Sequence, residues 1–119
     1  MQAVLENDRR GIKRRHLIFH LRVFDRETGE KLGHVVDISA EGMMLVSESA
    51  IDVDRDYKLQ MRLPDEEDRP TTHDFEGRTV WSSNDVNPAF FDTGFQVIQA
   101  SEEHIELVRH LVDLYGFRD

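Results

Sequence analysis

Apolar and polar residues alternate along most of the chain, and this alternation predicts six short β-strands. The clearest segment is YKLQMRL, residues 57–63, in which every second side chain is apolar, as expected for a strand with one buried face. Comparable alternation or short apolar runs cover residues 17–24, 32–39, 43–47, 73–82 and 92–98. The segments between these runs are rich in Gly, Pro, Asp, Asn and Ser, which is typical of turns and loops.

The last part of the chain has a different period, which predicts an amphipathic helix over about residues 101–115. Apolar side chains recur there at steps of three and four residues: Ile105, Val108, Leu111, Val112 and Tyr115. Ser101 is a suitable N-cap, and Glu102 and Glu103 suit the positive end of the helix dipole. Gly116 is typical of a helix end.

Six strands followed by one helix predict a mainly β fold. We expect a six-stranded antiparallel β-barrel with a C-terminal α-helix packed on it. Residues 1–15 are polar and lack a clear period, so they are predicted to form a flexible N-terminal arm. Residues 16–119 then make up the barrel domain together with its helix.

Length and composition limit the classes of protein to be considered. A chain of 119 residues is long enough for one domain with a core of its own. It contains no cysteine, which excludes disulfides, thiolate zinc sites and cysteine nucleophiles. The sequence has neither an apolar run of membrane-spanning length nor the apolar stretch of a secretory signal, so we expect a cytoplasmic protein.

The charge distribution is uneven. The formal net charge is -9, yet DRRGIKRR, residues 8–15, carries five positive charges and one negative. A binder of nucleic acid polymers needs a broad basic face, and an acidic chain does not supply one. A compact basic segment suits a small anion better, although a solvated, non-binding arm is the plainer interpretation.

The residue types that support catalysis or metal binding are not arranged for either purpose. His16 and His20 fall on a predicted strand, where four residues span about 13 Å, too far for one ion. His104 and His110 point to different sides of the predicted helix. The sequence shows no nucleophile beside a base and no glycine-rich phosphate loop, so we expect neither an enzyme nor a metal or cofactor site.

A binding motif is a stronger candidate, in DISAEG, residues 37–42. Asp37 and Ser39 are two apart on a predicted strand and therefore point to the same side. Val36 and Ile38 are expected to face the core, which places Asp37 and Ser39 on the outer face. Gly42 lets the backbone come close to a ligand. The alternative is an ordinary strand end and turn, in which these residue types are common.

Two arginine pairs have the spacing R-x-x-x-R. Arg10 and Arg14 lie in the basic arm. Arg14 precedes Asp37 by 23 residues, which is the length of a strand, a turn and a strand. The arm can then fold back over the face that bears Asp37. Arg22 and Arg26 run from a predicted strand into a turn and are interpreted as a decoy.

These motifs together resemble the PilZ domain family. That family combines an R-x-x-x-R arm with a [D/N]-x-S-x-x-G strand motif, and here the two are RGIKR, residues 10–14, and DISAEG, residues 37–42. HVVDISAEGMML and TGFQVI also resemble the family's strands, so the likeness covers almost the whole chain. It implies a six-stranded barrel and a receptor for the bacterial second messenger cyclic di-GMP.

The resemblance also implies which residues bind the nucleotide. Arg10 and Arg14 are expected to clamp it, together with Asp37, Ser39 and Gly42. Arg9 precedes the arginine motif, and in the family a basic residue there accompanies two stacked ligand molecules. The family further implies a downstream protein partner and control of motility, biofilm or exopolysaccharide. An interaction adaptor of the same fold that no longer responds to nucleotide is the alternative.

Overall fold

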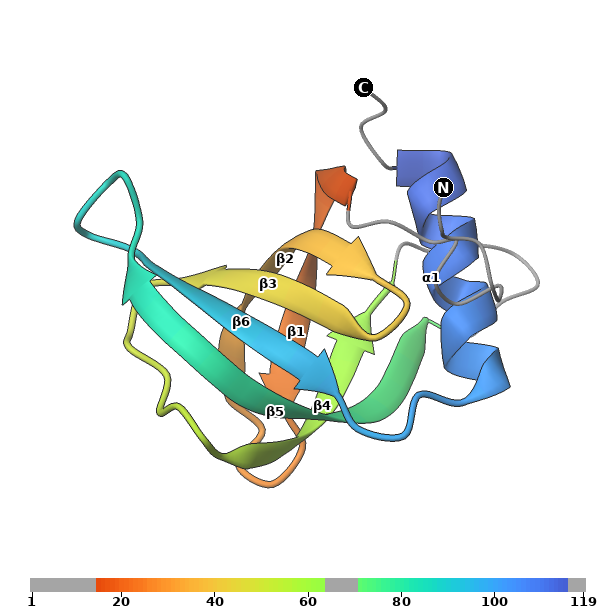
Figure 1. Cartoon of the computed structure of the whole chain (residues 1–119), viewed down its shortest axis with the longest axis horizontal. Helices are drawn as coiled ribbons and strands as arrows, with labels where there is room; N and C mark the ends of the chain where they lie inside the picture. The colour runs from red at the N-terminus through yellow and green to blue at the C-terminus, as the bar shows by residue number, and fades with distance from the viewer. Residues whose placement is uncertain (1–14, 64–70, 116–119) are drawn as a thin grey trace, which may run out of the picture.

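The computed structural model describes residues 15–63 and 71–115, and for residues 15–20 the backbone alone. Six strands form a closed antiparallel barrel in the order β1-β2-β3-β6-β5-β4, with β4 also paired to β1 (Figure 1). The strands are β1 (Arg15–Asp25), β2 (Lys31–Ser39), β3 (Gly42–Ser47), β4 (Asp56–Arg62), β5 (Thr72–Asn84) and β6 (Phe91–Val97). The barrel and the number of strands predicted from the sequence are confirmed.

The core lies inside the barrel and is made of alternate residues along the strands. Val23, Val35, Leu45 and Leu59 are completely buried, one from each of four strands. Burial of an aliphatic side chain of this size stabilises the fold by about 1.5–3 kcal/mol. The period of two in the sequence therefore records which residues face this interior.

Helix α1 (Glu102–Tyr115) packs beside β1 and β2 at one end of the barrel (Figure 1). The Ser101 hydroxyl accepts a hydrogen bond of 3.0 Å from the His104 backbone N–H, which confirms the predicted N-cap. Val108 and Leu111 belong to the buried core cluster, as the helical period predicted. Within the two described ranges, no helix is both long and apolar enough to cross a membrane.

The prediction for the inner face of β2 was wrong at Val36. Val35 is fully buried and Ile38 is 1% exposed, whereas Val36 is half-buried on the outer side. The register shifts between Val35 and Asp37, because two steps along β2 match one step along β3. This β-bulge changes which residues face inward, so Gly33 and Val35 precede it on the inner side and Ile38 follows it there.

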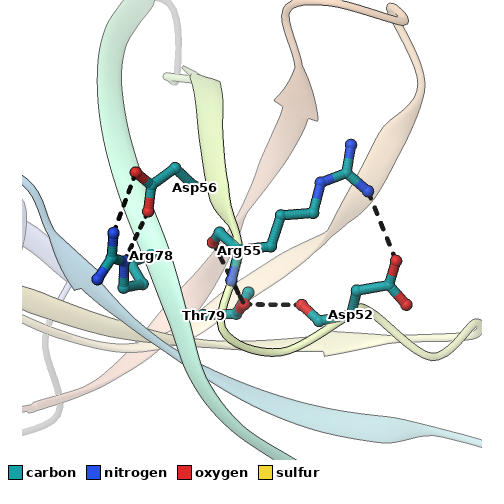
Figure 2. Close-up of polar contacts among 5 residues, drawn as sticks. All are labelled: Asp52, Arg55, Asp56, Arg78 and Thr79. Atoms are coloured by element: carbon teal, nitrogen blue, oxygen red, sulfur yellow. Dashed lines mark hydrogen bonds and ion pairs between the residues drawn. The ribbon is translucent and has the colours of Figure 1, made fainter.

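The connection from β3 to β4 is fixed to β5 through one residue, Thr79, by its backbone and by its buried side chain (Figure 2). The Thr79 hydroxyl donates to the Asp52 carbonyl oxygen at 2.7 Å and accepts from the Arg55 backbone N–H at 3.1 Å. Asp54 lies between them in the left-handed region, with φ of 57°. Thr79 is completely buried, so these bonds hold the loop without competition from water.

Candidate functional site

Two rows of paired residues cross the outer side of β2, β3, β6 and β5. In the first row Asp37 pairs with Met44, Met44 with Gly94, and Gly94 with Trp81. Directly paired residues in antiparallel strands project to the same side of the sheet, so these four residues share one face. The second row is formed by Ser39, Gly42, Gln96 and Arg78. We call the surface made by these eight residues the β2–β3–β6–β5 face.

Asp37 and Ser39 lie at one edge of this face, as the sequence predicted. Asp37 is only 6% exposed although it points outward, and Ser39 is half-buried. The Ser39 hydroxyl donates to the Gly42 carbonyl oxygen over 3.5 Å, a long and weak hydrogen bond. Its bonding capacity therefore remains largely available to a ligand.

Trp81 lies at the other edge and was not identified from the sequence. Its side chain is 38% exposed, and its indole lies directly on the backbone of Gly94. A Cβ atom built on Gly94 meets the Trp81 Nε1 atom at 2.1 Å. Glycine is thus required for the ring to lie flat on the sheet. An exposed aromatic ring held in this way offers a stacking surface for a planar base.

Arg78 adds a positive charge to the same face. Its guanidinium donates to both carboxylate oxygens of Asp56, at 2.7 and 3.3 Å (Figure 2). This hydrogen bonding lowers the pKa of Asp56, so the carboxylate stays charged and holds the arginine in place. Both side chains are more than half exposed, so this ion pair lies open to solvent at the edge of the face.

Asp92 continues the face toward the β5–β6 loop and was also not singled out from the sequence. It pairs with Val46 and with Ser83, and its Oδ1 atom is buried without a hydrogen-bond partner in the part of the chain that the structure describes. Burial raises its pKa, and the nearby Asp85 and Asp37 carboxylates raise it further. A buried acceptor of this kind can be satisfied by a donor on a ligand.

The predicted arginine contacts Arg9, Arg10 and Arg14 lie outside the described residues. The backbone nevertheless locates the point at which the arm joins the barrel, because Arg15 pairs with Ile38 and His16 with Asp37. The arm therefore leaves the barrel beside the carboxylate that it is predicted to cover.

The second arginine pair has a structural role at Arg26. Its Nε atom donates to the Leu59 carbonyl oxygen at 2.9 Å and its Nη2 atom to the Phe75 carbonyl oxygen at 3.2 Å. Arg26 therefore holds β4 and β5 at the turn after β1, whereas Arg22 is exposed. This agrees with the interpretation of Arg22 and Arg26 as a decoy.

Metal-binding side chains do not gather in the part of the chain that the structure describes. Among residues 15–63 and 71–115, no group of three or more His, Asp or Glu side chains could hold a metal ion. His104 faces His73 rather than His110, with 2.9 Å between the His73 Nε2 and His104 Nδ1 atoms.

Comparison with known proteins now identifies the family. A model of the PilZ domain matches residues 8–114. The chain belongs to the PilZ domain family. No curated protein sequence matches this PilZ domain.

Solved structures share the fold of this PilZ domain at low sequence identity. Bacillus subtilis MotI/DgrA, an inhibitor of motility, has a TM-score of 0.68 and 18% identity over 90% of this chain and 51% of its own. The PilZ domain of Escherichia coli YcgR with c-di-GMP has a TM-score of 0.66 and 12% identity over 89% and 90%. Borreliella burgdorferi PlzA in complex with c-di-GMP has a TM-score of 0.54 and 12% identity over 83% of this chain and 45% of its own. The chain thus spans about half the length of the first and third of these proteins.

Proposed function

We propose that this PilZ domain is a cytoplasmic receptor for cyclic di-GMP and has no catalytic role. The observation that carries the proposal is the β2–β3–β6–β5 face, which joins a carboxylate, Asp37, to an exposed ring, Trp81, within one row. The basic arm that leaves the barrel beside Asp37 adds to it. Family membership and the fold shared with PilZ proteins solved with c-di-GMP support the same conclusion.

Each group on the face has a counterpart on the ligand. The Asp37 carboxylate accepts hydrogen bonds from guanine N1–H and N2–H₂, and Ser39 bonds to a base or phosphate edge. Arg10 and Arg14 pair with the phosphates, engage the O6 and N7 atoms of guanine and stack on its plane. Gly42 has no side chain and lies beside Ser39, so that the ligand can come close to the backbone there, while Gly94 gives the Trp81 ring its place on the sheet.

The width of the face suits a ligand with two bases. Three strand spacings separate β2 from β5, about 14 Å in all. A guanine can therefore bind at Asp37 while a second base stacks on Trp81. Arg9 supports two stacked ligand molecules, because a second dianion beside the first is repelled unless another guanidinium offsets its charge.

The signal is carried by the arm. The ligand fixes residues 1–15 over the face, which gives a partner protein a different surface to bind. Such a partner places this domain in the control of motility, biofilm or exopolysaccharide. The likeness to an inhibitor of motility supports the first of these.

Arginine variants test the proposal. Arg10→Ala and Arg14→Ala each remove a charge-assisted contact of about 1.5–3 kcal/mol, so affinity for cyclic di-GMP should fall roughly ten- to hundredfold. Arg22→Ala is the matched control, since Arg22 is an exposed arginine on β1 outside the arm. The arm variants should leave thermal stability without ligand almost unchanged. A greater loss of binding for Arg22→Ala than for Arg10→Ala would refute the assignment.

A further inference from the structure

A pair of histidines joins helix α1 to β5, away from the β2–β3–β6–β5 face. His104, in the first turn of the helix, is 2% exposed, and its Nδ1 atom lies 2.9 Å from His73 Nε2. The Phe75 ring lies against both, with ring centroids 5.7 Å from His73 and 5.1 Å from His104. The other ring nitrogen of His104, Nε2, is buried and has no hydrogen-bond partner among residues 15–63 and 71–115.

This geometry limits where hydrogens can be. A neutral imidazole carries hydrogen on one ring nitrogen only. If His73 Nε2–H donates to His104 Nδ1, the hydrogen of His104 must sit on Nε2, where it is buried and unpaired. If His104 Nδ1–H donates to His73 Nε2, then His104 Nε2 carries no hydrogen. The second arrangement leaves no buried N–H unpaired, and an unpaired buried N–H is the rarer of the two defects.

Adding a proton to the pair excludes the arrangement in which no buried N–H is unpaired. A singly protonated pair that keeps its 2.9 Å bond must carry hydrogen on His104 Nε2, whichever ring holds the charge. A doubly protonated pair has two donors facing each other and cannot keep the bond. Acid therefore forces either an unpaired buried N–H beside a positive charge or separation of the helix from the strand.

We propose that the His73–His104 pair is a proton-sensitive latch, which holds the first turns of α1 on β5 while neutral and loosens the helix when it takes up a proton. Its neutral form carries hydrogen on His104 Nδ1. The latch acts on the helix and is independent of nucleotide binding.

The surroundings of the pair are mixed in charge. The charged and titratable groups that line the two hollows beside it are Arg26, Asp74 and Glu76 from the barrel and Glu103, Glu106, Arg109, His110 and Asp113 from α1. Glu103 and Asp74 favour a proton on His73, but burial outweighs them and lowers the pKa of His73. Arg26 lies 3.9 Å from Asp74 and offsets part of that carboxylate's charge.

The direction of the pH effect follows from His104. Burial, and then the charge of His73, lower the pKa of His104 from 6.5 to about 4 in the docked helix. Between these values an undocked helix binds a proton that the docked helix does not. Docking is therefore strongest above pH 6.5 and weakens as the pH falls toward 4. For His104 alone, linkage makes helix opening about twentyfold more frequent at pH 5 than at pH 7.

Amide hydrogen exchange of the ligand-free protein measures this opening. Corrected for intrinsic rates, amides of α1 should open about twentyfold more often at pH 5 than at pH 7, and core amides such as Leu45 should change less. His104→Met removes the buried proton acceptor at similar volume and should remove most of the difference, leaving only the smaller contribution of His73. His110 is a half-buried histidine on the same helix, and His110→Gln should retain the difference between the two pH values.

Two results would overturn the latch. One comes from hydrogen exchange: the α1 amides open equally often at pH 5 and pH 7, or His104→Met shows the same increase at pH 5 as the wild type. The other comes from ¹⁵N NMR spectra of the imidazole rings. This measurement uses the wild-type protein alone, so it does not depend on whether a variant folds. These spectra should show the Nδ1–H form of His104 at pH 7, and an Nε2–H form would contradict the assignment.

Discussion

One methyl group on Gly94 should displace Trp81 from the face. A Cβ atom at this position meets three atoms of the indole, Nε1 at 2.1 Å, Cε2 at 2.5 Å and Cδ1 at 2.7 Å. Non-bonded atoms prefer about 3.5 Å, so the ring must move by more than 1 Å or swing into solvent. The backbone of Gly94 does not have positive φ, so alanine is otherwise tolerated there.

The size of the effect follows from what the ring loses. Leaving the sheet exposes on the order of 50–100 Å² of indole surface, worth about 1–2.5 kcal/mol of unfolding free energy at 25 cal/mol per Å². Stacking of a base on an aromatic ring contributes about 1–3 kcal/mol, so cyclic di-GMP should bind roughly five- to 150-fold more weakly.

Fluorescence reports the movement directly, because Trp81 is the only tryptophan in the chain. Gly94→Ala should shift the emission of the ligand-free protein to longer wavelength and remove the change that ligand causes in the wild type. Gly42→Ala is the matched control, since its Cβ atom lies 3.3 Å from the Phe95 carbonyl oxygen and 3.5 Å from Ser39 Oγ. It should weaken binding without altering the ligand-free emission. Wild-type emission and affinity in Gly94→Ala would refute the role of Trp81.

Two further substitutions separate stability from binding. Thr79→Val should lower the free energy of unfolding, measured in urea, by about 1–3 kcal/mol, because the Arg55 N–H and the Asp52 carbonyl lose their partner. Thr72→Val, on the exposed part of β5, is the control and should leave it unchanged. Equal unfolding free energies for the two variants would contradict the role of Thr79 in holding the loop. Asp37→Ala should weaken cyclic di-GMP binding and reduce the preference over cyclic di-AMP, since adenine lacks the N1–H and N2–H₂ donors. An unchanged ratio of the two affinities would make Asp37 a structural residue.

The strands and the helix were predictable because each is a local pattern. The alternation in residues 57–63 and the three- and four-residue steps after Ser101 depend only on which side chains one element buries. The Ser101 cap was predictable for the same reason, since a cap bonds within its own first turn.

Features that depend on pairing between elements were not predictable in this way. The bulge at Val36 is defined by the register of β2 against β3, and alternation within β2 alone gives the wrong inner face. Trp81 enters the candidate site only because its partner is Gly94, which in turn pairs with Met44. His73 and His104 are 31 residues apart, so spacing along one element did not reveal them.

Isothermal titration of the protein with cyclic di-GMP tests the central claim most directly. We expect saturable binding with an endpoint of two ligand molecules per chain, accompanied by a change in Trp81 emission and strongly weakened in Arg10→Ala. An endpoint of one molecule would remove the role given to Arg9 and leave the receptor intact. Absence of saturable heat and of any change in emission would contradict the account and identify the domain as an adaptor that does not respond to the nucleotide.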